Sequence, residues 1–381
     1  MKSVDRWLLP DGIEELLPGP AARVEHLRRS LLDLHQRWGY QLVMPPLVEF
    51  TESLLIGLGS DIDMLTFRIT DQASGRGMGI RADITPQVAR IDAHSLAEAG
   101  VSRYCYAGSV LHTRPTAVLG SRSPIKLGAE LYGDASLQAD IEIISLMLET
   151  LQTAGVDRLT LDLGHVGICR QLLANSGLEP SQQTAIYDAL QRKSLPDLQS
   201  LLADVPGSDA LRALAGLHGG IDILSNLPEQ LDDTAIVELQ DVAAAITERY
   251  PEVDLYFDLA ELRGYQYHTG LVFSAYVPGQ GKALANGGRY DDVGEVFGRP
   301  RPATGFNTDL KTLLDITDKA IGTAPAPIAA PADGDAGLWA AIGALRDAGE
   351  IVIQSLSGET DARCNRVLVQ RDGQWTVEEQ I

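Results

Sequence analysis

The stretch RYCYAGSVLHTRPTAVLGSRSPIKLGAELYG, residues 103–133, decides the fold of this chain. Apolar and aromatic residues dominate both of its ends, as is typical of strands. The middle of the stretch is rich in Pro, Gly and Ser, which favour a loop. The sequence therefore predicts a strand, a loop and a second strand within these 31 residues.

The elements before this stretch follow from periodicity and from turn residues. Residues 21–38 carry apolar side chains at helical spacing, and Gly39 ends the predicted helix. An apolar run to Met44 suits a strand that stops at two prolines. Two further strands are expected within residues 64–70 and 77–83. A helix should follow, with Thr85 as its N-cap and Pro86 in its first turn.

The elements after the stretch combine strands with a long helical block. Apolar residues from Leu137 to Leu151 recur at steps of three and four, which predicts a core-facing helix. Residues from about 166 to 250 are expected to be mostly helical, and strand-like segments return between about 253 and 288. Strands on both sides of a helical block predict an α+β fold, in which helices flank a mainly antiparallel sheet.

Composition shifts divide the chain into three parts. Residues 1–321 are expected to form one large domain, with the helical block at about 166–250 as an insertion. GTAPAPIAAPADGD, residues 322–335, is typical of a Pro/Ala-rich linker. Residues 336–381 should form a short C-terminal α/β domain of a helix, a strand and a hairpin that turns at Asp372 and Gly373.

Bulk composition narrows the classes of function. The net charge is −21, from 31 basic and 52 acidic residues, which disfavours a nucleic-acid partner because affinity for nucleic acid comes largely from Lys and Arg. Three scattered cysteines indicate a reducing compartment and no zinc site. No signal peptide, membrane span, phosphate-binding loop or dinucleotide fingerprint is recognisable. We expect a cytoplasmic protein without a metal or cofactor.

Six segments, taken in order, resemble histidyl-tRNA synthetase, a class II aminoacyl-tRNA synthetase. The stretch at residues 103–133 is similar to the second motif of that family. Five other segments are similar to further family motifs: GYQLVMPPLVEF, IRADITPQVAR, LRGYQYHTGLVF, ANGGRYDDV and PATGFNTDLKTLL. Together they span about 300 residues, and the resemblance implies a class II synthetase-like sheet.

Three departures fall where the family binds ATP. His112 and Arg114 stand where the resemblance implies an arginine and a glutamate, and Thr312 replaces the arginine of the third motif. A charge-assisted hydrogen bond contributes about 1.5–3 kcal/mol. The loss of two arginines would therefore weaken ATP binding by about 10²–10⁴-fold. Arg122 remains in the loop, where solvation is its ordinary state.

The amino-acid side of the site is better retained. The resemblance implies a histidine pocket formed by Asp83, Thr85, Glu130, Arg263, Tyr267 and His268. His268 replaces a tyrosine of the family, and Lys126 replaces a glutamine. Local readings stand beside these roles: Thr85 as a helix cap, Glu130 and Arg263 as a buried ion pair, and Tyr267 as a core residue.

A synthetase-like chain without its ATP arginines and with a short tail resembles the regulatory subunits of ATP phosphoribosyltransferase. The resemblance implies a chain without catalytic residues of its own that pairs with a short catalytic subunit in histidine biosynthesis. It also implies self-dimers, a hetero-octamer, histidine as the inhibiting effector and no tRNA partner. The alternatives are an active histidyl-tRNA synthetase-like enzyme, an enzyme that attaches an amino acid to another acceptor, and a binding paralogue outside histidine biosynthesis.

Overall fold

The computed structural model describes residues 7–55, 60–115, 120–225, 227–228, 230–231, 233–262, 267–317, 321–322, 325–332, 336–356 and 359–379. The chain divides into two compact units, Met1–Lys319 and Ala320–Ile381.

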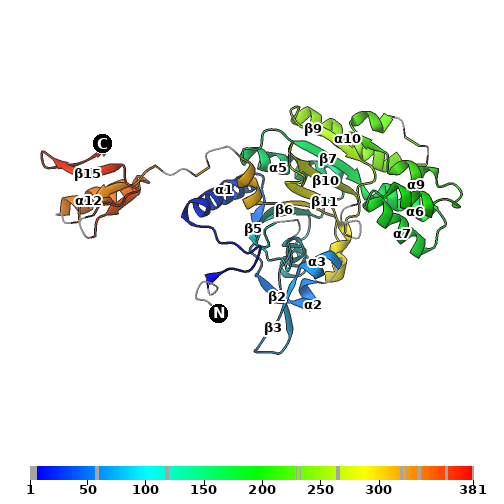
Figure 1. Cartoon of the computed structure of the whole chain (residues 1–381), viewed down its shortest axis with the longest axis horizontal. Helices are drawn as coiled ribbons and strands as arrows, with labels where there is room; N and C mark the ends of the chain where they lie inside the picture. Colours follow the sequence, from blue (N-terminus) through cyan, green and yellow to red (C-terminus); the bar gives the residue numbers. More distant parts are fainter. Residues whose placement is uncertain are drawn as a thin grey trace. The chain divides into compact units, whose positions relative to one another are not determined.

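A nine-stranded sheet is the centre of the first unit (Figure 1), with the strand order β1-β5-β6-β12-β11-β10-β7-β9-β8. Its strands are β1 Gln41–Leu42, β5 Ser102–Ser109, β6 Ile125–Tyr132, β7 Thr160–His165, β8 His218–Gly219, β9 Asp254–Asp258, β10 Leu271–Tyr276, β11 Ala285–Arg289 and β12 Ala303–Asp309. Only β1 with β5 and β7 with β9 pair in parallel. The predicted α+β class with a mainly antiparallel sheet is confirmed.

Most of β5 and the whole of β6 lie within the stretch at residues 103–133. These strands pair antiparallel along their whole length, from Ser102 opposite Tyr132 to Ser109 opposite Ile125. Because side chains alternate across a strand, Tyr106 and Glu130 lie on one face of the sheet, and Cys105 and Ala129 lie on the other.

Four helices contact strands of the sheet or pack against each other on one side of it: α1 Pro18–Arg37, α5 Leu137–Thr153, α10 Asp233–Arg249 and α11 Leu310–Ile316. Of the predicted apolar positions of α5, Ile141, Ile144, Leu148 and Leu151 are buried, and Leu137 at the first position of the helix is half-buried. The edge of the buried His35 ring meets Phe306 of β12, with ring centroids 5.8 Å apart. This face therefore forms the main apolar core.

Short elements lie over the other face, where Tyr106 and Glu130 point. They are β2 Val48–Phe50, α2 Thr51–Leu54, α3 Ser60–Leu65, β3 Phe67–Thr70, β4 Gly77–Ile80, α4 Thr85–Arg90, the π-helix Ile91–Leu96 and the 3-10 helix Asp291–Phe297. Strands β2, β4 and β3 form a small antiparallel sheet. The first turn of α4 packs next to β6, which positions the candidate site.

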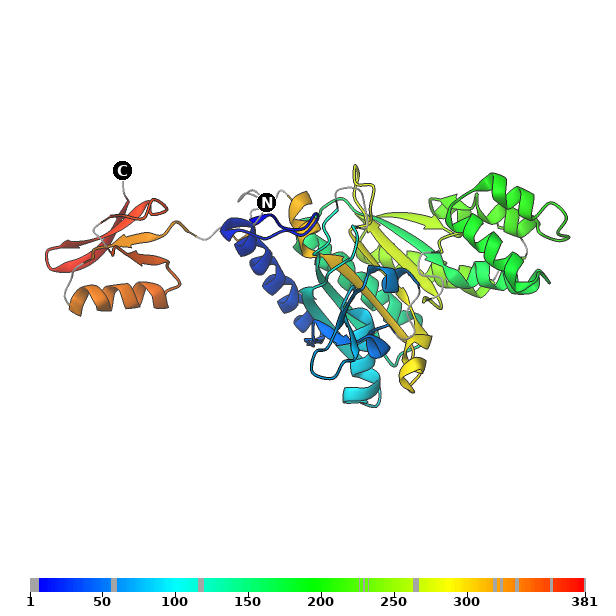
Figure 2. The ribbon, with the colours of Figure 1, turned by 60° about the horizontal axis from the view of Figure 1, so that its bottom comes forward.

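The segment after β7 is mostly helical and gathers at one end of the sheet (Figure 2). It contains α6 Val166–Asn175, α7 Pro180–Gln191, α8 Leu195–Leu201, α9 Asp209–Leu214 and the 3-10 helix Ile221–Ser225. Helix α10 then returns toward α5 and β7.

The second unit is a four-stranded sheet with one helix along one face (Figure 2). Its elements are β13 Ile328–Ala330, α12 Ala336–Asp347, β14 Val352–Gln354, β15 Arg366–Arg371 and β16 Gln374–Glu379. The linker prediction for residues 322–335 is wrong at β13, which pairs with both β14 and β15. These three residues are small or apolar and fully buried, whereas the prolines that suggested a linker flank the strand.

None of the described helices combines the length and apolar character that crossing a membrane requires. Over the same residues, no three His, Cys, Asp or Glu side chains are grouped so that they could hold a metal ion.

Candidate functional site

Helix α4 is held in place through its polar side chains. Glu49 of β2 accepts hydrogen bonds from Gln87 Nε2 at 2.9 Å and from Arg90 Nη2 at 2.7 Å. Arg81, just before the helix, donates to the backbone oxygens of Pro45 and Ser109. The segment IRADITPQVAR, residues 80–90, is therefore fixed between β2 and β5.

The Glu130 carboxyl is the centre of the site. Glu130 has no exposed surface, and Thr85 Oγ1 donates to its Oε1 over 2.7 Å. Tyr106 Oη donates to the same oxygen over 3.1 Å, and Tyr290 Oη donates to Oε2. Side chains from α4, β5 and the end of β11 thus converge on one carboxyl of β6.

Glycine at position 305 leaves room for this carboxyl. Gly305 of β12 lies opposite Glu130, and an added Cβ there would lie 1.6 Å from Glu130 Oε2. Gly288 of β11 likewise leaves room for the His268 ring, because a Cβ added at Gly288 would lie 2.7 Å from His268 Cδ2. Gly305 and Gly288 thus allow close packing of side chains against β12 and β11.

Burial sets the charge of Glu130. Removal of the carboxyl from water raises its pKa to about 8, against the lowering effect of the hydrogen bonds from Tyr290 and Thr85. The negative charge of Asp83 raises the pKa further. Glu130 is therefore mostly uncharged at neutral pH, unlike an ordinary glutamate.

Two aromatic side chains continue the site beside Glu130. The ring of Tyr267 stacks on Tyr290, with centroids 5.0 Å apart, and meets the His268 ring edge-on at 5.4 Å. The Tyr267 hydroxyl is buried, and none of the described groups forms a hydrogen bond with it. Such an orphaned buried hydroxyl marks a place that a polar ligand atom or a water fills.

The predicted histidine-pocket residues come together as far as they are described. Asp83 acts electrostatically on Glu130, and Thr85 and Tyr267 lie in its cluster. Arg263 lies outside the described residues, so its role and its ion pair with Glu130 stay predictions. The prediction of Thr85 as N-cap is wrong: α4 begins at Thr85, and Ile84 occupies the cap without a side-chain bond. The Thr85 hydroxyl bonds to Glu130 instead.

His112 lies on the side of the sheet where the resemblance implies ATP. It is buried, and its Nε2 lies 2.9 Å from the backbone oxygen of Ala82, so this nitrogen donates. Burial lowers the pKa of the imidazole. The position therefore holds a neutral ring that is turned toward the protein backbone.

The other positions on this side offer no arginine clamp. Arg114 is exposed, and its guanidinium approaches only the sulfur of Met64, at 3.8 Å, among the contacts of the described residues. Thr312 donates to Asp309 Oδ2 over 2.9 Å. Arg122 donates to the backbone oxygens of His112 and Asp11, at 2.9 and 3.0 Å. The remaining loop arginine is thus engaged by the chain itself.

Two lysines near these positions also have partners. Lys126 Nζ donates to Asn307 Oδ1 over 2.8 Å, and Lys311 Nζ lies 3.0 Å from Glu14 Oε1. A neutral amide leaves the Lys126 charge unpaired by this contact. Lys126, like Arg122, is therefore a cation whose printed hydrogen-bond partners on this side are neutral.

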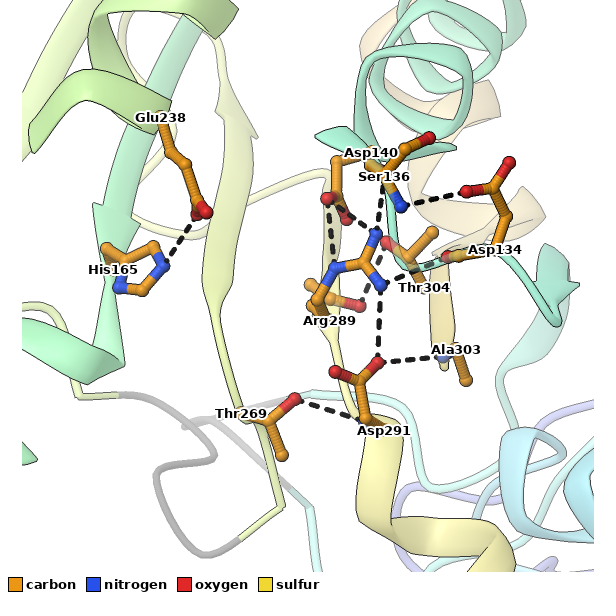
Figure 3. Close-up of polar contacts among 11 residues, drawn as sticks. Asp134, Ser136, Asp140, His165, Glu238, Thr269, Arg289, Asp291, Ala303 and Thr304 are labelled. Carbon is orange, nitrogen blue, oxygen red and sulfur yellow. Dashed lines mark hydrogen bonds and ion pairs between the residues drawn. The ribbon is translucent and has the colours of Figure 1, made fainter. Parts of the chain in front are cut away.

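A buried ion pair next to Tyr290 holds the end of β11 in place. Arg289, next to Tyr290, donates from Nη2 to Asp140 Oδ2 over 2.7 Å and from Nη1 to Asp291 Oδ1 over 3.3 Å (Figure 3). It also donates to the backbone oxygens of Asp134 and Ser136. Because its donors are satisfied inside the protein, Arg289 fixes β11 on α5 and is not a ligand-binding group.

The sequence reasoning missed Tyr106, Tyr290 and the partner of His165. Tyr106 of β5 lies opposite Gly128 of β6, and Tyr290 ends the GGRY segment. The alternation of side chains along the strands is the signal from which both tyrosines could have been predicted to face the site. His165 Nδ1 accepts from Gly167 N, and its Nε2 lies 3.1 Å from Glu238 Oε2 (Figure 3). It caps α6 and is structural.

Comparisons with families of known proteins cover both units. The family described as histidyl-tRNA synthetase matches residues 12–313. The family described as ATP phosphoribosyltransferase subunit HisZ C-terminal domain matches residues 325–378.

Curated relatives match over nearly their whole length. Proteins named ATP phosphoribosyltransferase regulatory subunit from Ectopseudomonas mendocina and Pseudomonas aeruginosa are 55% and 54% identical to this chain, over 99% of it and 99% of each relative.

Solved structures share the fold. A Bacillus halodurans protein described as an ATP phosphoribosyltransferase regulatory subunit/histidyl-tRNA synthetase is 25% identical with a TM-score of 0.81, over 94% of this chain and 95% of that one. A chain of the HisG:HisZ complex from Thermotoga maritima is 18% identical with a TM-score of 0.60, over 75% and 97%. At that identity, the second likeness is one of fold alone.

Proposed function

Because the chain belongs to the ATP phosphoribosyltransferase regulatory subunits, which share the histidyl-tRNA synthetase fold, we propose that it acts without chemistry of its own. Membership in this family confirms the resemblance drawn from the sequence motifs. The chain is a regulatory subunit, and its partner is a short-form catalytic subunit that makes phosphoribosyl-ATP in histidine biosynthesis.

The replacement of two family arginines by His112 and Thr312 is the observation that carries the proposal. ATP is polyanionic, and an enzyme that activates an amino acid needs fixed cations at the developing phosphate charge. Here His112 is a buried neutral ring, Thr312 bonds to Asp309, and Arg122 bonds to backbone oxygens. Synthesis of an adenylate on this chain is therefore disfavoured.

Histidine is the proposed effector, and the Glu130 cluster is its proposed site. The cluster offers a buried carboxyl, the acid Asp83 and the free Tyr267 hydroxyl, which suit a small polar ligand with a ring. Histidine would then control the partner by binding one global state of the complex better than another. A coupling free energy of about 1–3 kcal/mol would give about 5–150-fold control.

Self-association through the β1 edge is proposed as well. Strand β1 is the edge of the nine-stranded sheet, and Leu42 and Met44 are 45% and 75% exposed there. Beside them lies a surface cavity of about 590 Å³, lined by α1, β1 and Cys105. A second copy would cover this apolar edge, and such dimers would build the hetero-octamer with the catalytic subunit.

The chain is not expected to bind tRNA, and it is expected to lie in the cytoplasm. The second unit matches a HisZ C-terminal domain, and the net charge of −21 gives tRNA little attraction. Free thiols at Cys105, Cys169 and Cys364 favour a reducing compartment, which supports the cytoplasm.

Reconstitution with a short-form catalytic subunit tests the proposal. Isothermal titration should show histidine binding to the wild type, and Arg263→Ala should weaken it if the proposed pocket is right. Co-elution of the two subunits is expected. If the chain neither co-elutes with the catalytic subunit nor alters its rate, the role of a regulatory subunit for that partner is wrong. The alternative, an active amino-acid-activating enzyme, predicts histidine-dependent exchange of pyrophosphate into ATP by the chain alone.

A further inference from the structure

We propose that Lys193, just after α7, is a positioning residue that ties the helical insertion, helices α6 to α9, to the segment that carries Tyr267 and His268 of the proposed site. Through its ion pair with Asp258, the position of the insertion and the occupancy of the site would depend on each other. This inference rests on the proposed histidine site and adds a route by which bound histidine acts on a distant part of the chain.

The backbone at Lys193 is left-handed, with a φ of 51°. Helix α7 ends at Gln191, and Lys193 N then donates to Leu190 O while Ser194 N donates to Ala189 O. These two bonds form a Schellman motif, in which the left-handed position ordinarily holds glycine. Glycine is preferred there because it adopts a positive φ without a steric penalty.

Three other helices of this chain follow the ordinary rule. Helices α1, α5 and α12 end with the same pair of backbone bonds, and their left-handed residues are Gly39, Gly155 and Gly349. At the end of α7 a lysine takes the place of this glycine. Backbone strain of this kind is kept where the surrounding structure uses the residue, so the Lys193 side chain requires an explanation.

The Lys193 side chain reaches the sheet. Its Nζ forms an ion pair with Oδ2 of the buried Asp258, at the end of β9. The other oxygen, Asp258 Oδ1, accepts from Ala260 N over 3.1 Å. Asp162 of β7 and Glu261 add negative charge near the same ammonium. Because a buried carboxylate is costly without a cation, this pair fixes the end of α7 against the turn after β9.

The turn after β9 packs tightly on β7 and leads to the site. Glu261 N donates to Asp258 O over 3.0 Å. A Cβ added at Gly164 of β7 would lie 2.9 Å from Asp258 O and 2.7 Å from Glu261 Cβ. Further along the chain, Tyr267 stacks on Tyr290. A displacement of the turn is therefore carried along the chain toward the aromatic side chains of the site.

Two neutral contacts join the insertion to the same segment. Tyr187 Oη of α7 donates to Leu262 O over 3.3 Å, and Arg170 Nη2 of α6 donates to His268 O over 3.0 Å. Both acceptors are backbone oxygens. Lys193 adds the contact to a carboxylate, so its removal should loosen α7 from the segment while the fold of the insertion is kept.

Titration calorimetry with histidine and the full chain tests the inference. Lys193→Gly should bind histidine at least about fivefold more weakly than wild type. Its urea midpoint should stay close to that of wild type, because glycine relieves the left-handed backbone. Lys193→Arg keeps the cation and should recover most of the affinity. Arg192→Ala removes the neighbouring cation, which pairs with Asp197 inside the insertion, and should bind as wild type does.

A double-mutant cycle separates the ion pair from a loss of stability. Asp258→Asn removes the other charge and should weaken histidine binding as Lys193→Gly does. The double variant should then bind no more weakly than either single variant, because both changes break the same contact. Additive losses in affinity would overturn the assignment of the pair.

Hydrogen exchange gives a readout at the insertion itself. Saturating histidine should slow exchange of the backbone amides of α7 and α8 in the wild type, and this protection should be lost in Lys193→Gly. Wild-type affinity in Lys193→Gly, or no protection of α7 in the wild type, refutes the inference and leaves the histidine site standing. Absence of histidine binding, in the wild-type chain and in its complex, refutes the site and the inference together.

Discussion

Replacement of Glu130 by Gln should stabilise the first unit at neutral pH. The pKa of Glu130 is raised from 4.5 in the unfolded chain to about 8 in the fold. Stability that depends on its neutral form is fully present below pH 4.5 and is lost as the pH rises through 8. At pH 7, which is about 2.5 units above the pKa in the unfolded chain, ionisation of the carboxyl stabilises the unfolded chain. At 1.36 kcal/mol per unit, this lowers the free energy of unfolding by about 3 kcal/mol.

Glutamine removes this advantage of the unfolded state while keeping the shape of the side chain. Urea unfolding at pH 7 and at pH 4.5 measures the effect. Glu130→Gln should be about 3 kcal/mol more stable than wild type at pH 7, and close to wild type at pH 4.5. An equal difference at both pH values, or a loss of stability at pH 7 alone, would refute the reasoning that Glu130 is neutral in the fold.

Three further predictions concern buried groups on both faces of the sheet. Gly305→Ala should destabilise the first unit by about 2–3 kcal/mol and abolish histidine binding, because the added Cβ would overlap Glu130 Oε2; Gly281→Ala, with no atom within 4 Å, should stay within about 0.5 kcal/mol in the same urea assay. Burial lowers the pKa of His35 from 6.5 to about 3, so the wild type should lose up to about 1.4 kcal/mol per pH unit as the pH falls below 6.5, and His35→Gln should lack this slope. Arg289→Met leaves the buried Asp140 without its cation and should cost about 3–5 kcal/mol by urea unfolding; adding Asp140→Leu should recover much of that loss, and no recovery would contradict the ion-pair account.

The strands and long helices could be predicted because their signals are local. β5, β6 and α5 carry their alternation or helical spacing in consecutive residues, and their core positions are the buried ones. β13 could not be predicted in this way. It is three residues long, and its formation depends on pairing with β14 and β15, more than twenty residues away.

Thr85 shows how a local rule fails at a candidate site. A threonine before a proline and an apolar run ordinarily caps a helix. In the fold its hydroxyl lies 2.7 Å from Glu130 Oε1 on a strand 45 residues later, and this buried contact replaces the cap. The convergence of Tyr106 and Tyr290 on the same carboxyl depends equally on strand order, which the sequence does not state directly.

The central claim is that the nucleotide side no longer supports amino-acid activation and that the chain acts through its partner. The most direct measurement is phosphoribosyl-ATP formation by a short-form catalytic subunit, alone and with this chain, with and without histidine. Exchange of labelled pyrophosphate into ATP by the chain alone is followed in parallel, with an active histidyl-tRNA synthetase as the positive control. We predict that this chain accelerates phosphoribosyl-ATP formation by the catalytic subunit and that histidine inhibits the complex. The chain alone should exchange no pyrophosphate into ATP. Histidine-dependent exchange by the chain, with an unchanged partner, would contradict the account.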